Sequence, residues 1–195
     1  MANFTSLPTA VRSVADAAEL PWAHVLPYYR ALQTPVSPVR EAWMPKSVGR
    51  SIRAAEPKHI APLLIALAMA PHPGKANEAV DLVARLKLKR DSQLSNNQLD
   101  HHSGTALEEI ARFISQKKFA DTINHILINR YDLTVTFILY QGDPIIYKFM
   151  ISLDKLPGNH RPESPMFIPA VYIKGDFIRI LCETIHWAKT EQPST

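Results

Sequence analysis

Proline placement limits the folds open to this chain more than any other feature. Ten of its sixteen prolines lie between Pro8 and Pro73, within a chain of 195 residues. Proline lacks a backbone N–H and has a fixed φ, so it tends to begin or end helices and is excluded from central strands. The first part of the chain is therefore predicted to consist of short helices with abrupt ends.

A polar stretch, KRDSQLSNNQLDHHSG, follows at Lys89–Gly104 and contains no aromatic residue. We interpret residues 89–103 as a linker. It would separate a domain at 1–88 from a second domain at 104–195.

The segment 104–195 has the pattern of a small α+β domain. TALEEIARFISQ predicts a helix with its N-cap at Ser103, and KFADTINHILIN is expected to continue as a second helix that includes His125. LTVTFILY and IIYKFMISL, rich in β-branched and aromatic residues, predict a hairpin. MFIPAVYIK predicts a third strand, at an edge because of Pro169.

A last helix is expected to start at Gly175 and Asp176, with inward positions at Phe177, Ile178, Leu181 and Ile185. The predicted element order of the second domain is α-α-β-β-β-α. Cys182, the only cysteine, is expected to be a small core residue.

The charge of the chain is concentrated in its first half. Residues 1–102 carry twelve Lys and Arg against eight Asp and Glu, whereas residues 103–195 carry ten of each. A basic half next to a neutral half indicates a nucleic-acid or membrane partner for the basic half. No apolar run approaches the ~18 residues of a membrane span, and no secretory signal is visible, so we expect a cytoplasmic protein with no membrane partner.

The stretch Val11–Arg30, VRSVADAAELPWAHVLPYYR, has the spacing of two short helices that cross steeply. The crossing needs a small residue, supplied by Ala15. The turn, which normally has Gly, holds Glu19, and Pro21 can begin the second helix. Apolar residues stand at the positions expected to face the core, which are Val14, Ala18, Leu20, Val25 and Tyr28.

This window resembles the helix-turn-helix of bacterial and phage DNA-binding regulators. The resemblance implies that the second helix, Trp22 to Leu32, enters the major groove of double-stranded DNA. Trp22 and His24 would then lie nearest the base edges. Pro27 falls inside that helix, so we expect a kink or a restart there.

The following residues resemble the basic wing of winged-helix proteins, including the MerR and excisionase type. After a short helix predicted at VREAW, Gly49 permits a tight bend between Lys46 and Arg50, and Glu56-Pro57 opens an apolar helix. Basic residues of this region are expected to hold DNA phosphates; they are Arg30, Arg40, Lys46, Arg50 and Arg53. The phrases LPWAHVLPYYRAL and REAWMPKSVGR also resemble small regulators of phages and prophages of Gram-negative bacteria.

The predicted fold is thus a mainly α, winged helix-turn-helix domain followed by the small α+β domain. We expect a sequence-dependent DNA-binding protein, a transcriptional regulator of phage or mobile-element type. Its second domain would form a homodimer or a higher homo-oligomer, or would bind another protein. The alternatives are a phage DNA-packaging or replication accessory factor, and a protein–protein adaptor or inhibitor that does not contact DNA. A ligand-sensing role for the second domain also stays open.

Several residues allow a second interpretation. Trp22 and Trp43 could stack on DNA bases, but at helical spacing tryptophan is more often a core residue. The cluster Arg85, Lys87, Lys89 and Arg90 is either a second phosphate-contacting patch or the basic end of a helix. We expect no metal site at Asp100, His101 and His102, because adjacent side chains point apart and no second ligand cluster has the spacing of a metal site. We also expect no catalytic residue and no cofactor, because the sequence contains none of the common catalytic or phosphate-binding motifs.

Overall fold

The fold was analysed in a computed structural model of the chain. It describes residues 4–35, 41–46, 53–88, 104–130, 133–140, 145–150 and 170–188, with backbone alone at residue 88 and at 145–150. Within these ranges the chain is a mixed α+β protein, which confirms the predicted fold class at this level.

The first half contains short helices, as the prolines predict. They are α1 (Leu7–Ala17), α2 (Trp22–Leu32), α3 (Pro57–Met69), the 3-10 turn η1 (Pro73–Lys75) and α4 (Ala76–Ala84). Pro57 and Pro73 begin their elements, where a missing N–H costs least. Pro27 lies inside α2, which nevertheless runs without interruption from Trp22 to Leu32.

The second half combines helices with strands. The elements are β1 (Lys87–Leu88), α6 (Ala106–Ser115), α7 (Lys117–Ala120), β2 (Ile123–Asn129), β3 (Thr134–Leu139), β4 (Ile145–Met150), β5 (Ala170–Lys174) and α8 (Gly175–Thr184). The strands form an antiparallel sheet in the order β1-β4-β3-β2-β5. The three predicted strands and the last helix are confirmed, and β5 lies at an edge as expected from Pro169.

The predicted second helix at KFADTINHILIN is wrong beyond its first turn. Only Lys117–Ala120 is helical, and Ile123–Asn129 forms β2 between β3 and β5. The pairing of β2 with β3 shifts register between Ile123 and His125, as at a β-bulge. Because of the bulge, Ile123 and Ile126 are both buried although they are three residues apart. Buried residues at this spacing are also expected on one face of a helix. The domain order is therefore α-α-β-β-β-β-α, and His125 lies on a strand.

Two local predictions also need correction. The N-cap of α6 is Thr105, two residues after Ser103. The part of VREAW that the structure describes, 41–43, is not helical. Arg40 belongs to 36–40, which lie outside the described residues.

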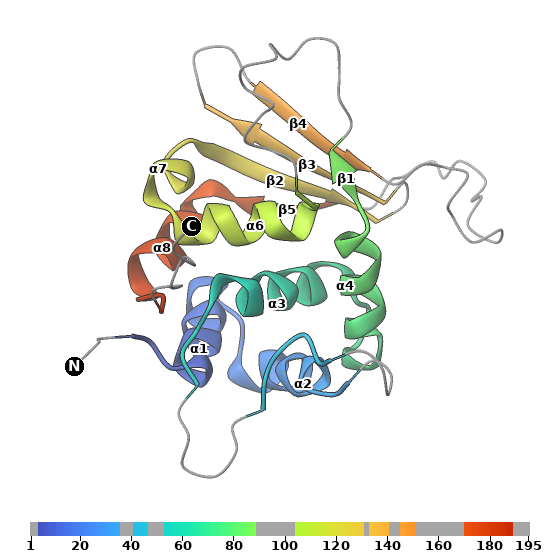
Figure 1. Cartoon of the computed structure of the whole chain (residues 1–195), viewed down its shortest axis with the longest axis vertical. Coiled ribbons are helices and arrows are strands. Elements are labelled where there is room, and N and C mark those ends of the chain that lie inside the picture. Colours follow the sequence, from blue (N-terminus) through green and yellow to red (C-terminus); the bar gives the residue numbers. More distant parts are fainter. Residues whose placement is uncertain are drawn as a thin grey trace, which may run out of the picture.

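The molecule is built in layers (Figure 1). The sheet lies at one end, α6 packs under it through Phe113 and Phe137, whose ring centroids are 5.3 Å apart, and α3 lies beneath α6. The pair α1 and α2 forms the layer at the opposite end (Figure 1). Helix α3 contacts α2 and α4 on one side and α6 on the other, and ten of its thirteen residues are buried.

Backbone hydrogen bonds also join the two halves. The Thr5 amide donates to the His186 carbonyl at 2.8 Å, and the Ala106 amide donates to the Leu86 carbonyl at 3.1 Å. The Arg130 side chain donates through Nε to the Ala68 carbonyl at 2.9 Å. The predicted linker, 89–103, lies outside the described residues. The division into two domains that fold independently therefore stays a prediction.

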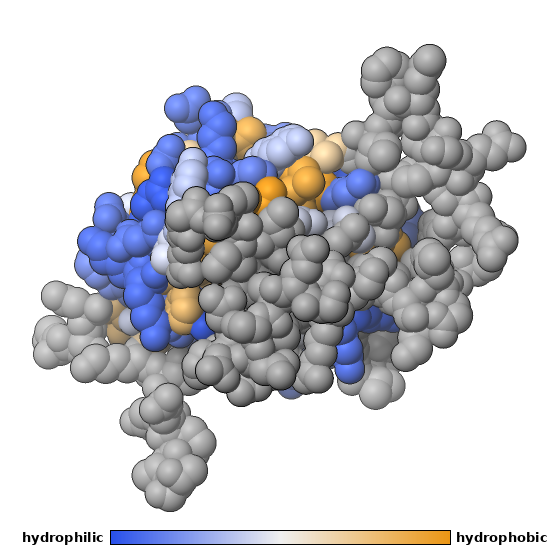
Figure 2. Space-filling view, turned by 90° about the horizontal axis from the view of Figure 1, so that it is seen from above, coloured by the Kyte–Doolittle hydropathy of each residue, from blue (hydrophilic) through white to orange (hydrophobic). Residues whose placement is uncertain are grey.

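The sheet end of the molecule carries a mixed surface. Figure 2 looks onto this end and shows hydrophilic and hydrophobic atoms side by side over the part that is coloured. Tyr172 on β5 is 63% exposed and Lys174, at the end of the same strand, is also exposed. Ile180 is 46% exposed on α8, which contacts α1. Cys182 is half-buried against the core, and burial raises the pKa of its thiol.

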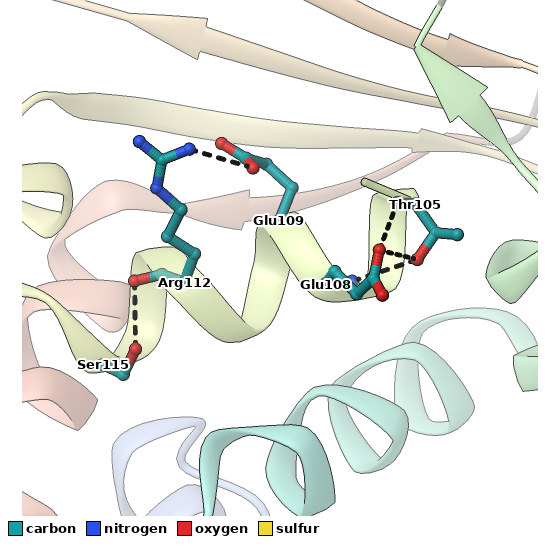
Figure 3. A network of polar contacts seen from close by, with 5 residues as sticks. All are labelled: Thr105, Glu108, Glu109, Arg112 and Ser115. Atoms are coloured by element: carbon teal, nitrogen blue, oxygen red, sulfur yellow. Dashed lines mark hydrogen bonds and ion pairs between the residues drawn. The ribbon is translucent and has the colours of Figure 1, made fainter. Parts of the chain in front are cut away.

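Helix α6 begins with a reciprocal cap (Figure 3). The Thr105 amide donates to Glu108 Oε2 at 2.6 Å, and the Glu108 amide donates to the Thr105 hydroxyl oxygen at 3.3 Å. This capping box satisfies two donors that a helix start leaves free. It places the carboxylate of Glu108 over its own helix terminus.

Gly175 is required where β5 turns into α8. A Cβ at this position would overlap the Ile123 carbonyl oxygen and lie 2.7 Å from the Asn124 carbonyl oxygen, both on the backbone of β2. Gly175→Ala is expected to lower the free energy of unfolding by about 1–3 kcal/mol, the usual cost of overpacking. Urea denaturation followed by circular dichroism measures the change.

Gly74→Ala is the matched control. Its Cβ would meet only the His72 side chain, at 3.2 Å, and His72 is exposed and able to move. We expect a change within about 0.5 kcal/mol. Equal effects of the two substitutions would contradict the close approach of α8 to β2.

Candidate nucleic-acid interface

A short turn joins helices α1 and α2. Four residues, 18–21, separate the two helices. Glu19, which stands where the sequence pattern normally has Gly, has a φ of 53°, in the left-handed region that Gly adopts most easily. Its amide donates to the Asp16 carbonyl at 3.1 Å, and the Leu20 amide donates to the Ala15 carbonyl at 2.9 Å. Glu19 thus has a left-handed backbone conformation at the position where the sequence pattern normally has Gly.

The inner faces of the pair match the expected apolar positions. Val14, Ala15 and Val25 are almost fully buried, and Tyr28 is 5% exposed, while Ala18 and Leu20 are half-buried. The Tyr28 hydroxyl donates to the Ala70 carbonyl at 3.3 Å, which ties α2 to the end of α3.

The neighbouring Tyr29 is also buried on α2. Burial raises the pKa of its phenol, against a smaller lowering by a hydrogen bond with Gln33. Tyr29 is therefore neutral at physiological pH, and the charge on α2 comes from its exposed side.

The exposed side of α2 carries Ala23, His24, Pro27 and Arg30. His24 is exposed one turn from Tyr28, with ring centroids 5.6 Å apart. Arg30 is in the last turn. Because Pro27 points outward, it interrupts a backbone hydrogen bond without disturbing the buried face.

Trp22 is both a core residue and a surface residue. It begins α2, is half-buried and packs against the core. The Arg12 guanidinium carbon lies 5.0 Å from the centroid of the Trp22 ring, within cation–π distance. Arg12, exposed on α1, was not selected from the sequence, and its contact with Trp22 brings a cation to the start of α2.

The other basic residues predicted to contact DNA, as far as the structure describes them, lie at the two ends of the α1–α2 layer. Lys46 is exposed on a segment held to the C-terminal end of α2, where the Met44 amide donates to the Leu32 carbonyl at 3.0 Å. Arg53 is exposed, and its carbonyl accepts a hydrogen bond from the Leu7 amide at the start of α1, at 2.8 Å. Arg50 lies outside the described residues, as does Arg40.

The predicted wing is not among the described elements. Its bend falls at 47–52, outside the described ranges. In the described residues that flank it, Ala54 forms an isolated antiparallel bridge with Ser6. Acidic residues also lie on this layer, since Asp16, Glu19 and Glu41 are exposed. The surface of the α1–α2 layer therefore carries both signs of charge. A polyanion would bind there through separate Lys and Arg side chains and not through one continuous basic patch.

The other candidates lie elsewhere. Trp43 is half-buried against the core and donates from Nε1 to Asp81 at 3.1 Å. Helix α4 ends at Ala84, so Arg85 is its C-cap and Lys87 belongs to the sheet layer, away from α2 (Figure 1). Lys89 and Arg90 lie outside the described residues, as do Asp100, His101 and His102.

Within the described part of the chain, no three His, Cys, Asp or Glu side chains gather as a metal ion would require. In the same ranges, no helix is both long enough and apolar enough to cross a bilayer. No protein-family model matches the chain, and searches among curated proteins and solved structures find no significant match.

The left-handed conformation of Glu19 gives a direct test of the turn. An L-residue with a Cβ is strained there, by about 1–2 kcal/mol, whereas Gly is not. Glu19→Gly is expected to raise the free energy of unfolding by up to about 1 kcal/mol, after the larger entropy loss of Gly is subtracted. Glu19→Ala keeps the Cβ and should stay within about 0.5 kcal/mol of the parent. A Gly variant less stable than the Ala variant in urea denaturation would rule out this turn geometry.

Proposed function

We propose that this chain is a sequence-dependent DNA-binding protein in which α2 enters the major groove. The observation that carries the proposal is the left-handed Glu19 between two short helices whose inner faces match the helix-turn-helix pattern. The position of α2 in the outermost layer supports it, because the sheet and α6 leave the exposed side of α2 free (Figure 1). A winged form of the domain, with its basic wing around Arg50, belongs to the same proposal.

In this proposal the residues divide by the part of DNA that they meet. His24 and Trp22, at the start of α2, lie nearest the base edges. Arg12 and Arg30 neutralise phosphates on either side of the groove, and Lys46 and Arg53 extend the contact to the ends of the layer. Arg40 and Arg50 add phosphate contacts from the segments between them. Few of these side chains match the common base readers, so phosphate contacts and DNA shape would supply most of the affinity.

The second half would join two protomers. A single small domain buries little DNA surface, and a two-fold dimer matches a palindromic site. Among the described strands β5 lies at an edge of the sheet, and Tyr172 and Ile180 are exposed. A strand edge with apolar neighbours is a common pairing surface, which supports this role. Such a protein would act as a cytoplasmic transcriptional regulator of phage or mobile-element type.

Light scattering separates this function from the alternative of a phage DNA-packaging factor. A dimer would favour the regulator, and a large ring would favour the packaging factor.

Charge reversal on the α1–α2 layer tests the proposal. Arg12→Glu combined with Arg30→Glu replaces two exposed cations, so the fold should persist while DNA affinity falls by at least about tenfold. The slope of log K against log salt should also fall by about one for each lost phosphate contact. Fluorescence anisotropy with labelled duplexes at several salt concentrations measures both quantities.

The matched control is Lys117→Glu combined with Lys118→Glu, which makes the same charge change on α7. Both lysines are exposed, and α7 lies beside the sheet, away from α2 (Figure 1). Equal loss of affinity in the two double variants would mean that only net charge matters, and no loss in the Arg12 and Arg30 variant would remove α2 from the interface.

A further inference from the structure

A cleft of about 790 Å³ lies between the two halves of the protein, apart from the exposed side of α2. Its walls come from the segment 41–46, the start of α3, the end of α4 and the first turns of α6. Trp43, Met44, Leu107 and Ala111 supply apolar surface. Its size is in the range of small-molecule sites, and a mostly apolar lining with a few polar groups is typical of them.

One of its lining residues, His59, is buried without full hydrogen bonding. The residue is 9% exposed, and its Nδ1 atom has no hydrogen-bond partner among the residues that the structure describes. Its Nε2 lies 4.0 Å from Glu56 Oε1. Burial lowers the pKa of the imidazole, against an opposing effect of Glu56, and Lys58 and Arg53 lower it further. The imidazole is therefore neutral at physiological pH, and an unsatisfied buried polar atom is costly unless something binds there.

The charged residues of the cleft fall into two groups. Lys58 and Glu108 are already engaged: Lys58 Nζ lies 2.7 Å from Glu56 Oε2, and Glu108 caps α6 with Thr105 (Figure 3). Lys46 and Glu41 are exposed and line the same cleft, and neither makes an ion pair or hydrogen bond with another described residue. Among the described residues, Lys46 and Glu41 are also not paired with each other. Within this part of the chain, the cleft therefore has one cation and one anion without an ion pair beside an apolar wall.

We propose that this cleft binds a small zwitterion with an apolar body, such as a free apolar α-amino acid. Its carboxylate would face Lys46, its ammonium group would face Glu41, and its side chain would lie against Trp43 and Leu107. A simple anion or a simple cation would form only one of these two charge-assisted contacts, so it should bind less tightly than a zwitterion that forms both.

Ligand binding at this site does not require DNA, although Lys46 also belongs to the proposed DNA interface. The segment that carries Lys46 is attached to the C-terminal end of α2, because Gln33 Nε2 donates to the Pro45 carbonyl at 3.1 Å. If the proposed function holds, a ligand here would act as an effector, and only that extension rests on the proposed function.

Three compounds that share a phenylethyl group but differ in charge test the ligand class. L-phenylalanine carries both charges, 3-phenylpropionate lacks the ammonium group, and 2-phenylethylamine lacks the carboxylate. Titrations of the full chain, without DNA, are followed by two-dimensional NMR, with the Trp43 indole N–H as the local reporter. L-phenylalanine is expected to bind at least about tenfold more tightly than either analogue, equivalent to about 1.4 kcal/mol.

Substitutions in the cleft locate the site. Lys46→Gln and Glu41→Gln change exposed side chains, so the fold should persist while L-phenylalanine binding weakens by at least about fivefold, or about 1 kcal/mol. Ala111→Phe fills the cleft from α6 and should abolish binding. Ala17→Phe makes the same change in a separate groove between α1 and β5 and should leave binding unchanged.

Three results would overturn the proposal. The first is the absence of shifts at the Trp43 indole with L-phenylalanine at millimolar concentration. The second is an analogue that binds as tightly as L-phenylalanine, which would reject the zwitterion. The third is unchanged binding in both the Lys46→Gln and the Glu41→Gln variant, which places the ligand elsewhere. Because no DNA is present, each outcome is independent of the proposed DNA binding.

Discussion

The burial of α3 is the constraint on which the rest of the structure depends. Ten of its thirteen residues are buried, and a helix that is apolar on nearly all sides must be covered on nearly all sides. Helices α2 and α4 cover one side and α6 covers the other. Each large aliphatic side chain so buried contributes about 1.5–3 kcal/mol relative to exposure. The helix therefore holds the α1–α2 layer and the sheet at opposite ends, and this arrangement leaves the outer side of α2 uncovered.

Elements whose signals are local could be predicted from the sequence. Pro57 after Glu56 marks the start of α3, and the β-branched residues of β3 and β4 identify these strands without any knowledge of their partners. Strand β2 could not be assigned in this way, because its bulge puts Ile123 and Ile126 on one face at a spacing that equally fits a helix. The cap at Thr105 was missed for a related reason: Ser103 and Thr105 both suit the N-cap, and the reciprocal bond with Glu108 decides between them.

The candidate sites show the same limit. The two short helices and their apolar positions can be predicted from the sequence. The left-handed backbone at Glu19 cannot be predicted from the residue itself, because residues other than Gly rarely have a positive φ. The contact of Arg12 with Trp22 crosses the turn and depends on how the helices pack. The cleft around His59 is assembled from separate segments of the chain, so neither spacing nor composition could indicate it.

We propose that the α1–α2 layer binds duplex DNA and that the same core also forms a ligand cleft. The decisive experiment is a gel-shift titration at two salt concentrations, with random duplexes and with the DNA that flanks the gene. We expect binding that weakens steeply as salt rises and that persists longest on the flanking DNA. Absence of any shift at the lower salt concentration would contradict the proposed DNA binding.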